Sequence, residues 1–278
     1  MKILVRLLRS PAGAAGLILT LLVLLGGLLA PLLAPHPYAA MSSQVMAAPS
    51  GAAWFGTDQF GRDVLSRTIY GVRISLEVAA ASAGAAALVG TLLGVTAGYF
   101  GGWWDALVMR LMGILMAFPS LLLAIGIMTM LGTSLVNVVV AIGLVYLPVF
   151  ARVARAPVLA LKEEDMITAA LALGASNPRI LWKYVLPNMI SPVVVQASLA
   201  ISNAVLTEAA LSYLGLGVRP PMPSLGALIQ EGQSMMMVAP WMAIFPGLVI
   251  MLMVFAFNLL GDTVRDQLDP RLRRMLGS

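Results

Sequence analysis

Residues 74–98 read ISLEVAAASAGAAALVGTLLGVTAG, and this stretch decides the fold class. It contains one charged residue, Glu77, and its apolar residues do not alternate with polar ones as they would in a half-buried strand. A helical membrane span needs about 20 mainly apolar residues. The stretch therefore predicts a transmembrane helix. Gly90, Gly94 and Gly98 recur every four residues on one face of it, which predicts close packing against another helix rather than a gate.

The composition of the whole chain agrees with a membrane protein. Of its 278 residues, 60% are hydrophobic and 10% are charged, and the mean hydropathy is +0.95. A soluble domain carries about 25% charged residues. In lipid, helices and closed barrels are the structures that satisfy their own backbone hydrogen bonds. Because the apolar runs are long and do not alternate, we predict an all-α, polytopic membrane protein.

Six apolar runs qualify as spans, at about residues 12–34, 74–98, 106–130, 135–150, 190–211 and 241–260. The fourth is the shortest, and Pro148 makes its end the hardest to place. Pro119, Pro148 and Pro246 remove backbone hydrogen bonds and are expected to kink their helices. We predict an N-terminal anchor helix with its external loop (1–72), a transmembrane core (73–265) and a cytoplasmic tail (266–278).

Basic residues predict the orientation, because cytoplasmic loops carry an excess of Lys and Arg. One side of a six-span chain holds Lys2, Arg6, Arg9, Arg110, Arg152, Arg155, Lys162, Arg179, Lys183, Arg265, Arg271, Arg273 and Arg274. The other side holds Arg62, Arg67, Arg73 and Arg219. Both termini and a loop at about 151–188 should therefore be cytoplasmic, and loops at about 35–73 and 215–240 external.

The first apolar run is longer than the core of a cleavable signal peptide, so we expect a retained anchor.

Several function classes are disfavoured. The chain has no cysteine and one histidine, His36, which argues against disulfides, thiol chemistry and a His-rich metal site. No lysine completes a phosphate-binding Gly-x-x-x-x-Gly-Lys-Ser/Thr loop, and His-Glu-x-x-His and Gly-x-Ser-x-Gly are absent from the sequence. We expect no cofactor, metal or catalytic residue in this chain. The net charge of +5 lies at the ends of apolar runs, which favours membrane orientation over nucleic-acid binding.

The predicted cytoplasmic loop contains a distinctive segment. Residues 165–179 read DMITAALALGASNPR, and YVLPN follows at 184–188. Small residues up to a glycine suit a helix that ends in a tight turn, and Asn177-Pro178 favours a break and a restart. The loop is therefore predicted to be helix, turn, helix, with a surface that a partner can approach closely. An ordinary amphipathic linker between two spans is the alternative.

The same segment resembles the ABC-importer permeases, whose loop carries Glu-Ala-Ala, three residues, Gly, nine residues, Ile, one residue and Leu-Pro. The matching residues are Ala169, Ala170, Gly174, Leu186 and Pro187, with Thr168 in place of the glutamate and Tyr184 in place of the isoleucine. Further stretches resemble the dipeptide, oligopeptide and nickel branch of this family, and within it the second, or C-type, permease. They are residues 55–76, 208–217, 245–247, 257–262 and 269–271.

The resemblance implies a function and a set of partners. A chain of this family pairs with a second permease subunit, contacts two ATPase subunits that hold ATP and Mg, and receives solute from an external binding protein at the bacterial inner membrane. It would translocate dipeptides or oligopeptides by alternating access, with nickel import as the alternative inside the family. The residues expected to couple to the ATPase are Thr168, Ala169, Ala170, Gly174, Ala175, Ser176, Arg179, Leu186 and Pro187.

The fifth span suggests a solute path. Gln196, Asn203 and Thr207 fall within a sector of about 40° on a helix. Polar side chains are costly against lipid, so this stripe should face protein or water. Ser191, Ser198 and Ser202 form a second stripe on nearly the opposite face, and small hydroxyls suit helix packing. We assign the first stripe to the path and the second to a neighbouring helix, with interhelical hydrogen bonds at both stripes as the alternative.

A secondary transporter or channel is the main rival class. Ion-coupled carriers usually place ionisable groups deep in their spans. Here the candidates are Glu77 and Glu208, both expected near helix ends, and a structural hydrogen bond is the favoured role for Glu208. Met235, Met236 and Met237 are expected to pack as apolar side chains in an outer loop, because thioethers suit Cu(I) far better than Ni(II).

Overall fold

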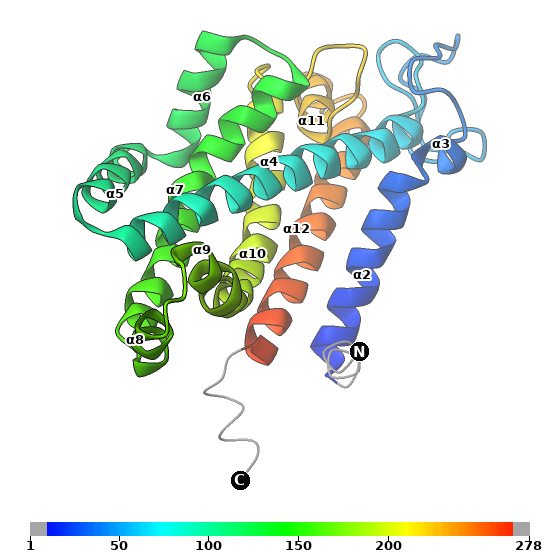
Figure 1. Cartoon of the computed structure of the whole chain (residues 1–278). Helices are drawn as coiled ribbons and strands as arrows, with labels where there is room; N and C mark the ends of the chain where they lie inside the picture. The colour runs from blue at the N-terminus through cyan, green and yellow to red at the C-terminus, as the bar shows by residue number, and fades with distance from the viewer. Residues whose placement is uncertain (1–9, 269–278) are drawn as a thin grey trace.

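The computed structural model describes residues 10–268 and is helical, without a strand in that part of the chain. The helices are α2 (Pro11–Leu28), α3 (Ala30–Leu33), α4 (Val64–Phe100), α5 (Gly102–Met116), α6 (Ser120–Leu131), α7 (Leu135–Lys162), α8 (Asp165–Ala172), α9 (Asn177–Ile180), the π-helical turn η1 (Leu181–Val185), α10 (Leu186–Tyr213), α11 (Leu225–Gln233) and α12 (Trp241–Leu268). The all-α prediction is confirmed (Figure 1). The stretch 269–271 and most of the predicted tail lie outside the described residues, as do Lys2, Arg6, Arg9, Arg271, Arg273 and Arg274.

Five helices are long and apolar enough to cross a membrane, and a sixth span is formed if the bent pair α5 and α6 counts as one. The two helices of this pair meet at 93°, so the run predicted as one span at 106–130 is bent far more sharply than the kink expected at Pro119. Pro119 is the physical reason, because a proline has no N–H and restrains the residue before it. Helix α7 extends beyond the fourth predicted run, which was placed at about 135–150, and continues through Pro148 and Pro157 to Lys162.

Helix α4 crosses the bundle obliquely and packs along α7 (Figure 1). The three spaced glycines make this contact. A β-carbon at Gly90 would lie 2.7 Å from the carbonyl oxygen of Leu147, and one at Gly98 would lie 3.1 Å from Cβ of Val158. The predicted close packing is therefore confirmed.

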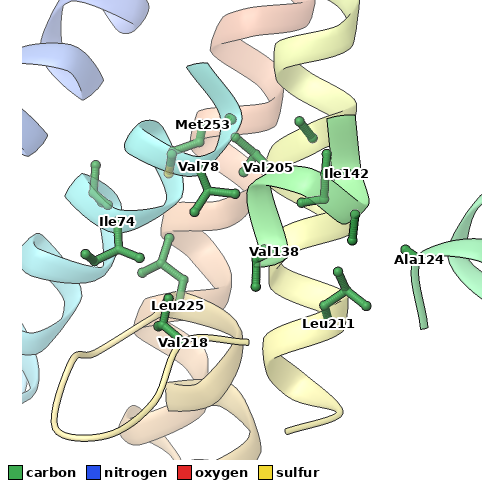
Figure 2. Packing of buried hydrophobic residues seen from close by; sticks show 14 of the residues in the cluster. Ile74, Val78, Ala124, Val138, Ile142, Val205, Leu211, Val218, Leu225 and Met253 are labelled. Atoms are coloured by element: carbon green, nitrogen blue, oxygen red, sulfur yellow. The ribbon is translucent and has the colours of Figure 1, made fainter. Parts of the chain in front are cut away.

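The buried core lies where α4, α7, α10 and α12 meet (Figure 2). Val78, Val138, Ile142, Val205 and Met253 are buried in it. Helix α2 packs on α12 and α4, and Thr20 Oγ1 donates a hydrogen bond to the carbonyl oxygen of Ala256 (3.2 Å). The predicted anchor helix is thus part of the packed bundle.

The bundle has two distinct ends (Figure 1). The start of α2, the end of α12 and the connection α8–α9 lie at one end, here called the terminal end. Helices α3 and α11 and the loop between α3 and α4 lie at the other, here called the far end. The six-span prediction likewise placed the termini and the loop 151–188 on one side.

Candidate coupling loop and solute path

The connection between α7 and α10 is a helix, a tight turn and a second helix, as the sequence predicts. Helix α8 ends at Ala172, and Gly174 follows with φ of +77°, a conformation that favours glycine. The N–H of Gly174 donates to the carbonyl of Leu171 (2.9 Å), and the N–H of Ala175 donates to the carbonyl of Ala170 (3.0 Å). This pair of bonds is the Schellman motif that ends many helices.

One face of this loop packs against the bundle. Ile167 and Ile180 are buried together with Val95, Ala154 and Val158, which belong to α4 and α7. In addition, Tyr99 at the end of α4 donates a hydrogen bond from its hydroxyl to Asn177 Oδ1 (2.9 Å). The loop is therefore fixed to the ends of α4 and α7.

The opposite face is exposed and contains most of the predicted coupling residues. Exposed there are Thr168, Ala169, Gly174, Ser176 and Arg179, whereas Ala175 is half-buried and Ala170 is buried. Several large apolar side chains that sequence reasoning missed share this surface. They are Met166, Leu171, Leu173 and Trp182, and Leu173 is 88% exposed. The sequence could have indicated them, because the segment at 165–173 has apolar residues on both faces and only one face can pack against the bundle.

Leu186 and Pro187 lie apart from the exposed turn, at the start of α10. The preceding turn is π-helical, with the N–H of Leu186 bonded to the carbonyl of Leu181. Pro187 cannot donate to the turn before it, and its ring would crowd a regular α-helical turn. From Asn177 to Tyr213 the chain stays helical, so the loop is joined directly to the span that carries the polar stripe.

The predicted path residues lie along α10, away from the loop. Asn203 is exposed, and Gln196 and Thr207 are half-buried. Thr207 Oγ1 lies 3.2 Å from the hydroxyl of Tyr146 on α7, and Asn203 Nδ2 donates to the carbonyl of Leu199 (3.1 Å). The chain's own helices therefore leave this stripe partly uncovered.

The serine face of α10 points to α12. Ser202 is buried and its Oγ donates to the carbonyl of Val254 (3.3 Å). A β-carbon at Gly261 would lie 3.2 Å from Ser198 Oγ, which brings the two helices close. These two serines pack against a neighbouring helix as predicted.

Glu208 is fully buried in α10 and is held by two hydroxyl groups. Ser75 Oγ of α4 donates to its Oε2 (2.6 Å), and Ser212 Oγ donates to its Oε1 (2.7 Å). The favoured structural role is confirmed, because the first bond joins α4 to α10. Glu77 instead forms an exposed ion pair with Arg73 (2.9 Å).

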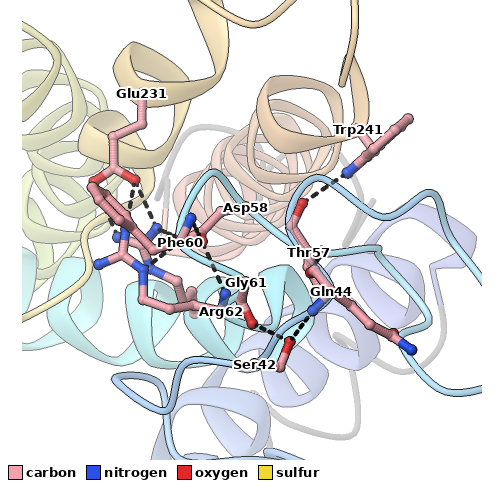
Figure 3. Close-up of polar contacts among 10 residues, drawn as sticks. Ser42, Gln44, Thr57, Asp58, Phe60, Gly61, Arg62, Glu231 and Trp241 are labelled. Atoms are coloured by element: carbon pink, nitrogen blue, oxygen red, sulfur yellow. Dashed lines mark hydrogen bonds and ion pairs between the residues drawn. The ribbon is translucent and has the colours of Figure 1, made fainter.

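At the far end, buried and half-buried charges join the loop before α4 to α11 (Figure 3). Arg67 NH1 lies 2.5 Å from Asp58 Oδ2 and 2.7 Å from Glu231 Oε2. Arg62 Nε contacts the same Asp58 oxygen at 2.6 Å. Asp58 also accepts the backbone N–H groups of Phe60 (2.8 Å) and Arg62 (2.9 Å). We call Asp58, Arg62, Arg67 and Glu231 the far-end ion cluster.

Met235, Met236 and Met237, at the far end, only partly match the prediction that they pack as apolar side chains. Met235 packs against a cluster with Val64 and Met242. Met236 and Met237 are 44% and 97% exposed, so packing is wrong for these two. They lie in the turns after α11, which direct them outward. Within residues 10–268, no group of three or more His, Cys, Asp or Glu could hold a metal ion.

A bundle of spanning helices with this loop at one end fits the permease class of ABC importers, and the comparisons with known proteins place the chain in that class. The family model described as "Binding-protein-dependent transport system inner membrane component" matches residues 90–274, and the chain belongs to that family. A second model, "N-terminal TM domain of oligopeptide transport permease C", matches residues 2–49.

Individual proteins agree with the family. The chain is 44% identical over 269 residues to the dipeptide transport system permease protein DppC of Alkalihalophilus pseudofirmus, covering 96% of this chain and 88% of that protein. It is 46% identical over 225 residues to the glutathione transport system permease protein GsiD of Pectobacterium atrosepticum, covering 81% and 75%. A solved structure of the MetNI methionine ABC transporter in an inward-facing conformation has a TM-score of 0.58 at 19% identity, covering 74% of this chain and 96% of that one. This last similarity shows the fold.

Proposed function

We propose that this chain is the C-type permease subunit of an ABC importer for dipeptides or other short peptides in the bacterial inner membrane. The relatives named for dipeptide and glutathione transport support a peptide solute. The chain itself would bind no nucleotide. ATP and Mg would be held by two ATPase subunits, a second permease would complete the path, and an external binding protein would deliver the peptide.

One observation carries the proposal, namely the exposed apolar surface on a loop that is fixed to α4 and α7 and continues directly into α10. A partner subunit could pack against the exposed side chains of Leu171, Leu173 and Trp182. On the other face, the buried side chains of Ile167 and Ile180 hold the loop against the bundle. A conformational change driven by ATP requires contacts that differ between two states of the complex. Closure of the ATPase pair would displace this loop, and the helix from Asn177 to Tyr213 would move the span that carries the polar stripe.

Replacing Gly174 by leucine is expected to abolish most ATP-driven uptake. A β-carbon at Gly174 meets nothing within 4 Å inside this chain, so the bulk of leucine would project towards the partner. Leucine is also strained in the positive-φ conformation of residue 174, which costs roughly 1–3 kcal/mol of conformational energy. Peptide uptake into proteoliposomes and co-purification of the ATPase subunits should both fall, while peptide binding by the external protein stays unchanged.

Gly215 provides a matched control at the end of α10. It has φ of +78°, and a β-carbon there also meets nothing within 4 Å. Gly215→Leu therefore imposes similar backbone strain away from the proposed ATPase surface. If both variants lose ATPase association equally, the loop is not the specific contact with the ATPase. Normal peptide uptake by Gly174→Leu would also contradict the assignment of this loop to coupling.

The proposed orientation places the terminal end in the cytoplasm and residues 51–68 outside. It is motivated by the excess of Lys and Arg on the side of the termini. Since the chain has no native cysteine, Ser176→Cys and Ser50→Cys can be compared directly. In intact cells, a membrane-impermeant maleimide should label the second variant only. Labelling of Ser176→Cys from outside would reverse the orientation.

The proposed path is tested by cysteines along α10. Gln196→Cys and Asn203→Cys should react with a small water-soluble thiol reagent, because their face of α10 would border water. The rate should change when a non-hydrolysable ATP analogue traps the complex. Ser202→Cys, adjacent in sequence but buried against α12, should remain unreactive. If neither path cysteine reacts in a complex that still transports, the stripe serves packing and not the path.

A further inference from the structure

Helix α5 is separated from its neighbouring helices by a break in the helical backbone at each end. Before it lie Gly101 and Gly102, with φ of +67° and +59°, and the ψ of −155° at Gly101 belongs to a region that is essentially restricted to glycine. After it, residues 117–119 form the 93° bend to α6. The helical hydrogen bonds of α4 and α6 therefore do not continue into α5.

An ion pair attaches the first turn of α5 to α7. Arg155 donates to Asp105 through two atoms, Nε to Oδ1 and NH2 to Oδ2, both at 2.6 Å. Two parallel bonds of this kind fix the relative orientation of the two groups as well as their distance. The side chains are 30% and 18% exposed, so water screens the pair only in part.

The attachment point on α7 lies one turn from a residue that packs against the coupling loop. A β-carbon at Gly98 would lie 3.2 Å from the carbonyl oxygen of Arg155, so α4 and α7 are in close contact there. Val158, one turn further along α7, is buried against Ile167 and Ile180 of the loop. A displacement of the loop therefore acts on Arg155 through packed side chains and backbone.

The other end of α5 lies beside the polar stripe. Leu115 and Met116, at the end of α5, line a cavity of about 180 Å³ together with Phe118, Ser120 and Tyr146. The hydroxyl of Tyr146 is 3.2 Å from Thr207 Oγ1, a member of the stripe. A tilt of α5 would change the shape of this cavity next to the proposed path.

We propose that α5 is a hinged lever, and that Asp105 and Arg155 are positioning residues which make it follow the coupling loop. This inference rests on the proposed transport function. In the importer, the ion pair stays closed while the loop moves, and α5 carries the movement from its first turn beside α7 to the cavity beside Tyr146. Without the pair, ATP would still be hydrolysed but the path would respond weakly.

Charge reversal in the complete reconstituted complex tests the lever. Asp105→Arg or Arg155→Asp alone should lower the amount of peptide transported per ATP by about tenfold, a typical size for coupling between separate sites. ATPase association and hydrolysis should stay near normal, and the double reversal should restore most of the transport ratio. Arg152→Asp is the matched control, because Arg152 lies one turn earlier on α7, is exposed and makes no ion pair within residues 10–268. It should leave the ratio unchanged.

A second variant applies if the single reversals fail to assemble. Asp105→Cys combined with Arg155→Cys, joined through two disulfides by a short bis-methanethiosulfonate reagent, should keep transporting, since the two ends move together. Loss of transport on cross-linking, reversed by a reductant, would overturn the lever, as would equal losses of transport and hydrolysis in assembled single reversals. If Asp105→Arg and Arg155→Asp leave the amount of peptide transported per ATP unchanged, the lever is refuted but the transport function is not. A wild-type complex that takes up no peptide with ATP refutes the proposed function.

Discussion

Gly94→Ala is expected to destabilise the folded chain by about 3 kcal/mol, near the upper end of the usual cost of overpacking. A β-carbon at Gly94 would overlap the carbonyl oxygen of Ala151 and lie 2.9 Å from its carbonyl carbon. These are backbone atoms, so no side-chain rotation can relieve the overlap, and α4 must separate from α7. The measurement is the melting temperature of the purified protein in detergent, with the yield of assembled complex as a second readout.

Gly84 in the same helix is the matched control. It is exposed, and a β-carbon there meets nothing within 4 Å. Gly84→Ala makes the same chemical change and removes a residue that favours helices less than alanine does. Its melting temperature should equal or exceed that of the wild type. Equal stability of both variants would show that α4 and α7 do not pack as closely in the membrane as in the structure.

The helical class and most spans could be predicted from the sequence, because lipid leaves few choices to a long apolar run. The break in the third span was harder to predict. Apolar residues continue on both sides of Pro119, and neither hydropathy nor a single proline distinguishes a kink from a 93° bend. The small helices α3 and α11 were missed as well, since each is shorter than the runs that hydropathy detects.

The coupling loop was predictable in shape because its signals are local. A glycine after a helix and an Asn-Pro pair require only neighbouring residues to act. Its exposed apolar side chains were not predicted, because exposure of Leu173 depends on which face meets α4 and α7. The serine stripe and the amide stripe of α10 also differ in whether their contacts can be known from this chain. The structure shows a partner for Ser202 in α12, whereas any second permease subunit that covers Asn203 is a separate chain.

The far-end ion cluster shows what a local pattern cannot reveal, since Arg67 and Glu231 are separated by 164 residues in the chain. Asp58, Arg62 and Arg67 are recognisable as charged residues before a span, but their partner in α11 is known only from the fold. Pairing two loops through nearly buried charges fixes α11 against the start of α4. Asp58, Arg62 and Arg67 therefore have a structural role within the stretch 55–76.

Arg67→Ala is expected to cost about 3 kcal/mol of folding stability, because removing one partner of a buried ion pair leaves the others uncompensated. Arg67 is 3% exposed and Asp58 is 1% exposed, so water cannot replace the lost guanidinium. Arg62 would still contact Asp58, which keeps the loss from being larger. The check is the melting temperature of the purified protein, with Arg152→Ala as control. Arg152 is exposed and makes no ion pair within residues 10–268, so that variant should melt like the wild type. If both variants melt alike, the cluster does not hold α11 in place.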